Sequence, residues 1–104
     1  MDKVISFIQP SRNNLKYLKW SYDSIRKNLS PIHEICWADD FSDDGTWEWM
    51  QEIAEKDKNV RIIRNSGPDR LGHTILYDRL VELATNDIVM IYHADMYACP
   101  NMDV

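Results

Sequence analysis

Two pairs of polar residues in this chain of 104 residues have the types and spacing that ligand or metal chemistry requires. Asp39 and Asp40 are adjacent and follow an apolar run, while His93 and Asp95 stand two positions apart after another. A carboxylate at the end of a strand can accept hydrogen bonds from a nucleobase imide or a ribose hydroxyl. An imidazole and a carboxylate two positions apart on extended backbone lean to the same side, where they can ligate Mn²⁺ or Mg²⁺.

Each pair also has a purely structural interpretation. Asp-rich loops before helices are common, because carboxylates accept hydrogen bonds from the free amides of a first helical turn. Asp43 and Asp44 suit that role better than the adjacent pair, since two neighbouring carboxylates cannot both cap one helix. A cation held by His93 and Asp95 would stabilise the charge of a departing diphosphate, but a structural, hydrogen-bonded histidine explains the isolated pair equally well.

Four apolar, β-rich runs alternate with three segments of helical period, which is the rhythm of a parallel α/β sheet. The runs 4–8, 34–38, 60–64 and 87–92 predict strands, the first of them ended by Pro10. The charges of the third run, Arg61 and Arg64, favour a sheet edge for that strand.

The helical segments separate these strands. Apolar residues at spacings of three and four predict a helix from residue 14 that ends before Ser30. Thr46 is the expected N-cap of a second helix, and a third covers 74–84. We therefore predict a three-layer α/β/α fold with a mostly parallel, four-stranded sheet. The carboxyl ends of its strands would bring both polar pairs to the same edge.

Composition limits the classes of protein that fit. The chain has 12 Lys and Arg against 17 Asp and Glu, a formal net charge of −5. This balance argues against a nucleic-acid partner, whose phosphates require clustered basic residues. Hydrophobic residues make up 44% of the chain, yet no stretch approaches the roughly 18 apolar residues of a membrane span. We expect one cytoplasmic domain with Cys36 and Cys99 as reduced thiols.

Phosphate-binding signals outside the two pairs are weak. His73, near the start of the third helical segment, is placed to contact phosphate, although exposed loop charges are usually just solvated. The chain has 3 glycines and neither G-x-G-x-x-G nor G-x-x-x-x-G-K-[ST]. Dinucleotide cradles and P-loops are therefore not expected.

Five segments in chain order carry a family resemblance: residues 10–13, 38–46, 60–65, 82–85 and 93–95. They resemble the family 2 glycosyltransferases of GT-A fold, whose usual patterns are P-[ST]-Y-N, V-D-D-G-S-x-D-G-T, R-x-I-x-N, L-A-x-G and D-x-D. The set is specific because it keeps the family order over nearly the whole chain, although each motif alone would not be.

The resemblance implies a Rossmann-like GT-A half that binds a nucleotide-sugar through a divalent metal. By this resemblance, Asp40 holds the uracil of a UDP-sugar, and Asp95 binds the Mn²⁺ or Mg²⁺ that grips the diphosphate. His93 stands where the family has Asp and is the second candidate metal ligand. The resemblance also implies that Pro10 and Arg12 line the base pocket. Tyr77 and Asp78 stand where many members have an Arg-Asn pair, so His73 and Arg79 are the nearest substitutes for phosphate or ribose contacts. Asp39, the other member of the aspartate pair, is the remaining candidate for nucleotide binding.

The chain departs from the family pattern at two positions near these residues. Arg12 replaces the usual Tyr and offers a guanidinium plane that can stack on a base, and Phe41 replaces the Gly after the two aspartates.

The family's acceptor-binding half and its general base follow the D-x-D region. We therefore expect residues 1–104 to form a single donor-binding domain without a general base, inactive or incomplete alone. A missing C-terminal half or a homo-oligomer would complete it.

Two other functions are weighed against a glycosyltransferase. A nucleotidyltransferase-like domain can use a similar sheet, but it would need a glycine-rich, basic loop after the first strand, and residues 10–13 contain no glycine. A non-catalytic interaction module would keep the fold and bind a partner through exposed aromatic residues such as Trp49 and Tyr97.

Overall fold

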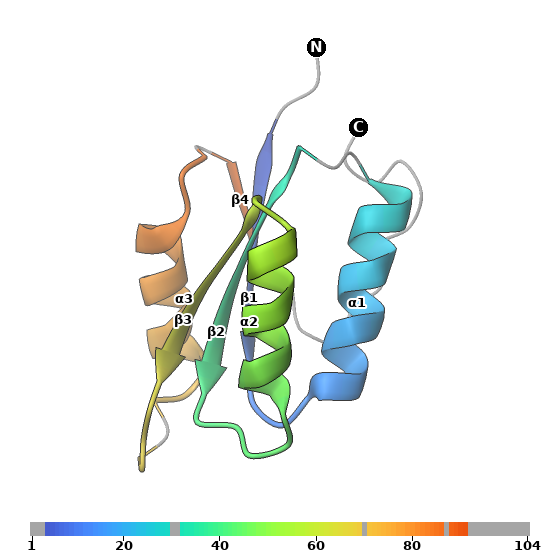
Figure 1. Cartoon of the computed structure of the whole chain (residues 1–104). Coiled ribbons are helices and arrows are strands. Elements are labelled where there is room, and N and C mark those ends of the chain that lie inside the picture. The colour runs from blue at the N-terminus through green and yellow to red at the C-terminus, as the bar shows by residue number, and fades with distance from the viewer. Residues whose placement is uncertain (1–3, 30–31, 70, 87, 92–104) are drawn as a thin grey trace.

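A computed structural model describes residues 4–29, 32–69, 71–86 and 88–91 of the chain (Figure 1). Its elements alternate strictly between strand and helix. In chain order they are β1 (Ile5–Ser11), α1 (Leu15–Asn28), β2 (Glu34–Asp40), α2 (Thr46–Lys56), β3 (Val60–Asn65), α3 (His73–Leu83) and β4 (Ile88–Ile91). The strands form one sheet in the order β3-β2-β1-β4, and each described pairing is parallel. The predicted α/β class and the edge position of β3 are confirmed.

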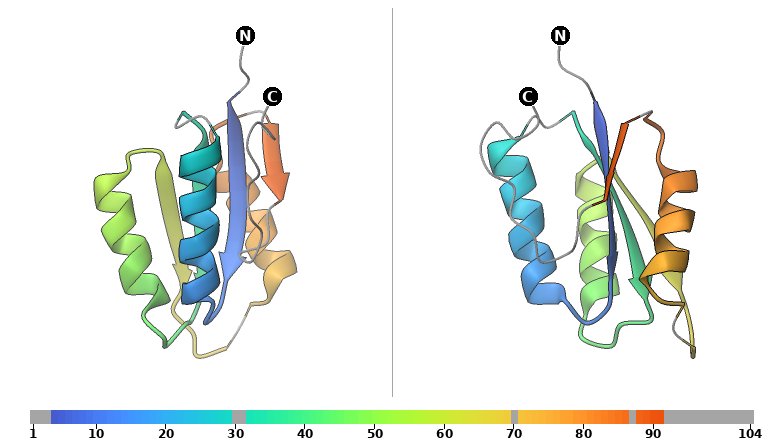
Figure 2. Two further views of the ribbon diagram at one scale, coloured as in Figure 1. Left: turned by 90° about the vertical axis from the view of Figure 1, so that its right-hand side faces the viewer. Right: turned by 180° about the vertical axis from the view of Figure 1, so that it is seen from behind.

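The helices lie on both faces of the sheet, with α1 and α2 on one face and α3 on the other (Figure 2). Each face buries its own apolar cluster. Phe7, Ile35 and Trp37 pack under α1 and α2, whereas Ile8, Cys36 and Ala38 pack under Leu76 and Leu80 of α3. A sheet buried on both sides explains why its central strands read as nearly continuous apolar runs. No helix within the described residues is long and apolar enough to cross a membrane.

Trp49 is not the exposed aromatic platform that the sequence suggested. Its ring centroid lies 5.0 Å from that of Trp37 and 5.8 Å from that of Tyr22. The residue is half-buried against the α1 and α2 cluster, because its position on α2 turns it toward the sheet. Trp49 therefore contributes part of its ring to the packing against this cluster, and Tyr97 lies outside the described residues.

Pro10 does not end β1, contrary to the prediction. The strand continues to Ser11, with Pro10 opposite Ala38 and Ser11 opposite Asp39 in β2. The described pairing of β1 with β4 runs from Ile5 to Ile8, opposite the four described residues of β4. A proline lacks an N–H and therefore cannot donate a ladder hydrogen bond, but it can keep the extended backbone of a strand.

Thr46 is the first residue of α2 and not its N-cap, so that prediction is also wrong. Gly45 takes the N-cap position with a φ of 92°. The side chain of Asp44 accepts hydrogen bonds from the amide and the hydroxyl of Thr46 and from the amide of Leu15, at 3.3 Å. Asp44 thereby ties the start of α1 to the start of α2.

Glu34 organises the opposite, amino-terminal edge of the sheet. Its carboxylate accepts hydrogen bonds from Ser6 Oγ (2.8 Å), from the amide and the hydroxyl of Thr85 (both 2.9 Å), and from Cys36 Sγ (3.4 Å). Burial raises the pKa of Glu34, but the hydrogen bonds from Thr85, Ser6 and Cys36 outweigh it and lower the pKa overall. This network holds the segment after α3 against the sheet.

The stability contributed by Glu34 should depend on pH. Its pKa is lower in the folded chain than in the unfolded one, so the contribution is full above the unfolded value of about 4.3 and is lost as the pH falls through the folded pKa. We expect Glu34→Gln to lower the free energy of unfolding by about 2 kcal/mol at roughly pH 7, and by less in acid.

Urea denaturation of both proteins over a range of pH measures this difference. Glu82→Gln, at an exposed position of α3, is the matched control and should change stability by less than about 0.5 kcal/mol. A Glu34→Gln difference that stays constant down to acid pH would contradict the assignment.

Candidate functional site

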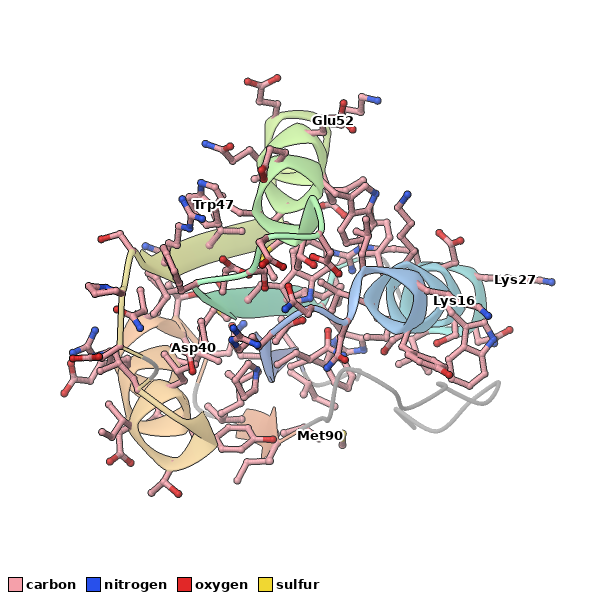
Figure 3. All side chains as sticks on the ribbon, turned by 90° about the horizontal axis from the view of Figure 1, so that it is seen from below. Lys16, Lys27, Asp40, Trp47, Glu52 and Met90 are labelled. Atoms are coloured by element: carbon pink, nitrogen blue, oxygen red, sulfur yellow. The ribbon has the colours of Figure 1, made fainter. Side chains whose placement is uncertain are left out.

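The candidate site lies at the edge where β1, β2 and β3 end. The loops 12–14, 41–45 and 66–72 leave the sheet there, and Figure 3 views the molecule from this end. Successive side chains on a strand point to opposite faces. Because Trp37 packs under α1 and α2 while Ala38 packs under α3, Asp39 belongs to the α1 and α2 face and Asp40 to the α3 face. The two adjacent carboxylates therefore serve different sides of the sheet.

Asp40 organises the loop between β3 and α3. Its Oδ1 accepts from Asn65 Nδ2 (2.8 Å) and the Leu71 amide (3.0 Å), and its Oδ2 accepts from the Gly72 amide (3.0 Å). Figure 3 shows Asp40 on the side of the sheet that α3 covers. Burial raises the pKa of Asp40, but these hydrogen bonds and the nearby charge of Arg12 lower it overall. A carboxylate accepts about four hydrogen bonds, so the ionised Asp40 keeps capacity for one more.

Asp39 is fully buried on the other face. Its Oδ2 accepts from the Ser42 amide (3.1 Å) and pairs with Arg64 Nε (3.3 Å). The guanidinium of Arg64 also lies 5.5 Å from the centre of the Trp47 ring, so one arginine joins β3, α2 and the carboxylate. The remaining oxygen, Oδ1, is buried and has no hydrogen-bond partner among the described residues. A buried carboxylate oxygen without a donor is rare in proteins and needs an explanation.

Ser11 and Arg12 supply two more such atoms next to Asp39. Ser11 stands opposite Asp39 in the register of β1 and β2, and Arg12 follows it. The Ser11 hydroxyl and Arg12 Nε are both buried without a hydrogen-bond partner in the part of the chain that the structure describes. The site thus holds a charged acceptor (Asp39), a charged donor (Arg12) and a hydroxyl that can do either.

Asn13 fixes the loop that carries Arg12. Its amide donates to Ser42 Oγ (2.9 Å), and its side-chain oxygen accepts from the amide of Asp43 (2.9 Å). Asn13 has a φ of 53°, a left-handed conformation that asparagine tolerates better than most residues. Sequence reasoning did not assign a role to Asn13 or Ser42. Asparagine in a loop between two predicted elements was the available signal for this turn.

Phe41 is a second residue with an unusual backbone at this edge. It directly follows Asp40, has a φ of 57°, and remains 38% exposed. Its ring contacts Gly67 so closely that a Cβ at Gly67 would lie 2.6 Å from Cγ and Cδ1 of the ring. The β2–α2 loop and the β3–α3 loop therefore meet through an aromatic ring and a glycine.

Of the other residues expected at the site, some lie at this edge and one does not. Pro10 is buried within β1, and His73 is the first residue of α3, next to the Gly72 amide that binds Asp40. Arg79 is exposed and lies six residues further along α3, a rise of about 9 Å. The structure does not bring Arg79 to the Asp39 and Asp40 edge.

The predicted metal ligands follow β4 in the sequence. His93 and Asp95 lie outside the described residues, which end at Ile91 of β4. Within the described ranges, no group of three or more His, Cys, Asp or Glu side chains is arranged to hold a metal ion.

Solved structures share this fold. The mannosyltransferase PcManGT from Pyrobaculum calidifontis, in complex with GDP-Man and Mn²⁺, matches 91% of this chain with a TM-score of 0.74 and 23% identity. TarS 1–349 from S. aureus in complex with UDP matches 90% with a TM-score of 0.77 and 23% identity. The same protein in complex with UDP-GlcNAc gives a TM-score of 0.73 and 22% identity over 90% of this chain.

These structures are much longer than this chain, which covers 28%, 28% and 27% of them respectively. No curated protein matches the chain. The model of the family described as Glycosyl transferase family 2 matches residues 6–103, nearly the full length. A nucleotidyltransferase has no support from these matches, and the chain belongs to glycosyl transferase family 2.

Proposed function

We propose that this chain binds the nucleotide-sugar donor of a glycosyl transfer reaction, with UDP as the nucleotide, at the carboxyl edge of its sheet. The observation that carries the proposal is the group of three buried polar atoms without described partners: Ser11 Oγ, Arg12 Nε and Asp39 Oδ1. Such groups are stabilised when a ligand or water completes their hydrogen bonds. All three lie at the ends of β1 and β2, where α/β sheets bind ligands.

The chemistry of these atoms suits the base of UDP. The imide edge of uracil is one N–H donor between two carbonyl acceptors, so it needs one acceptor and two donors. Asp39 or Asp40 supplies the acceptor, Arg12 Nε is a donor, and the Ser11 hydroxyl can donate. Cytosine and adenine lack the imide N–H and would set a ring nitrogen lone pair against a carboxylate. The edge therefore favours uracil over these two bases.

Asp39 and Asp40 differ in how many of their hydrogen bonds are already made within the chain. Asp39 Oδ1 has no partner among the described residues, whereas Asp40 already accepts three hydrogen bonds and retains capacity for one more. The family resemblance assigns the imide contact to Asp40, and we adopt that assignment. Asp39, on the other face of the sheet, is held by Arg64 and by the Ser42 amide, and it positions the loop that follows β2.

The relatives support the class of donor. One is a complex with GDP-Man and Mn²⁺, and two are complexes of TarS with UDP and with UDP-GlcNAc. Each binds a nucleoside diphosphate or its sugar ester, and this chain shares their fold.

A divalent cation fits the residues proposed to hold it. Asp95 supplies carboxylate oxygen and His93 imidazole nitrogen, a donor set that suits Mn²⁺ better than Mg²⁺. When bound, the cation would neutralise the diphosphate as it leaves the sugar. Base recognition is separate from this and is performed by the loops after β1 and β2, which Asn13 and Ser42 clamp together.

Base selectivity tests the nucleotide assignment. We expect the wild-type chain to bind UDP more tightly than CDP by at least about tenfold, because one imide contact discriminates by about 1–3 kcal/mol. In Asp40→Asn, one of the oxygens that accept from Asn65, Leu71 and Gly72 becomes an N–H donor, so the affinity for both nucleotides should fall. Because the new N–H can donate to the cytosine ring nitrogen, the UDP-to-CDP affinity ratio should also fall by about tenfold. Calorimetric titration with each nucleotide measures both quantities.

Two further variants make this experiment specific. Asp43→Asn changes an exposed carboxylate of the same loop and should leave the ratio unchanged. A ratio that changes in Asp39→Asn and not in Asp40→Asn would transfer the imide contact to Asp39. A wild-type chain that gives no binding heat with any nucleoside diphosphate would contradict the proposed function.

Metal dependence is a separate prediction. We expect Mn²⁺ to raise the affinity of the wild-type chain for UDP, and Asp95→Asn to abolish that increase, because the carboxylate charge is lost from the site. His93→Ala should weaken the increase without changing binding in EDTA. The measurement is a UDP titration with saturating Mn²⁺ and another with EDTA, and Asp69→Asn, an exposed loop carboxylate, is the control. Equal UDP affinity in both conditions would rule out the metal role.

A further inference from the structure

Phe41 has a backbone conformation that is unfavourable for a residue with a bulky side chain. A φ of 57° is common for glycine and uncommon for a bulky aromatic residue. The family pattern has glycine at this position, so the strain is a feature of this chain. Strained residues of this kind persist where the surroundings hold them, and they cluster at binding sites.

Core packing does not account for Phe41. The residue remains 38% exposed, in contrast to Phe7, which is fully buried in the α1 and α2 cluster. Gly67 is shaped to receive the ring, since a Cβ there would come within 2.6–2.9 Å of Cγ, Cδ1 and Cδ2. The fold thus seats one part of the ring on Gly67 and leaves another part accessible at the edge.

The surroundings of Phe41 indicate what its exposed surface could contact. The residue immediately before it is Asp40, and the three partnerless polar atoms lie at the ends of the same strands, β1 and β2. A planar base that uses its edge on these polar groups exposes two flat faces, each of which is stabilised by stacking on an aromatic ring or a guanidinium.

We propose that Phe41 provides a stacking surface for the base of the bound nucleotide, which the polar groups of Ser11, Arg12 and the adjacent aspartates recognise at its edge. This inference rests on the proposed function and adds a binding residue that the family pattern does not contain. A stacking role explains three features together: the exposed ring of Phe41, its strained backbone, and the glycine that accommodates the ring.

Substitutions at Phe41 separate stacking from a purely structural role. Phe41→Leu keeps an apolar side chain without a π-face, and Phe41→Gly also relieves the positive φ. We expect both variants to lower UDP affinity by about tenfold, the range of one base–aromatic stack. Phe41→Tyr should stay within about threefold of the wild type, and all variants should bind pyrophosphate as the wild type does.

The controls distinguish the possible failures. Tyr17→Leu, at an exposed aromatic position of α1, should not change UDP affinity. Thermal unfolding of each variant shows whether the fold is intact, and Phe41→Leu remains informative if Phe41→Gly is unstable. Wild-type UDP affinity in a folded Phe41→Leu, or equal losses in Phe41→Leu and Phe41→Tyr, would overturn the stacking role. Absence of UDP binding by the wild-type chain would instead overturn the proposed function on which it rests.

Discussion

The register of β1 against β2 is the constraint on which the rest of the candidate site depends. Both strands are buried on both faces, so the side-chain alternation is set by Phe7, Ile35 and Trp37 on one side and by Ile8 and Ala38 on the other. A slip of one residue would exchange these faces. The same register places Ser11 opposite Asp39 and turns Asp39 and Asp40 to opposite faces.

Buried carboxylates then organise the loops that follow these strands. Removing an ionised carboxylate from water is unfavourable unless hydrogen bonds or a cation compensate it. Asp40 recruits donors from Asn65, Leu71 and Gly72, while Asp39 recruits Arg64 and the amide of Ser42. Because these partners come from β3, the β2–α2 loop and the β3–α3 loop, satisfying two charges also fixes the loops between which a ligand would bind.

Sequence patterns predicted the alternation of elements and the edge that carries Asp39 and Asp40, because these depend on hydrophobic period and parallel topology. They failed where a neighbour decides the local structure. Pro10 stays in β1, where it stands opposite Ala38 of β2, and Asp44, not Thr46, accepts the hydrogen bond from the first amide of α2. The Arg64 contact and the Phe41–Gly67 contact were not predicted, since each joins residues distant in sequence that only the fold brings together.

The two edges of the sheet differ in a way that favours the carboxyl edge as the functional one. At the amino edge, Glu34 has donors for both carboxylate oxygens, so its network is complete within the chain. At the carboxyl edge, the described part of the chain leaves Asp39 Oδ1, Arg12 Nε and Ser11 Oγ without partners, and it holds both described non-glycine residues of positive φ, Asn13 and Phe41. Local strain and incomplete hydrogen bonding reduce stability, and proteins retain them mainly where binding requires them. Their concentration at one edge of a sheet that is otherwise well packed is the physical argument for a ligand there.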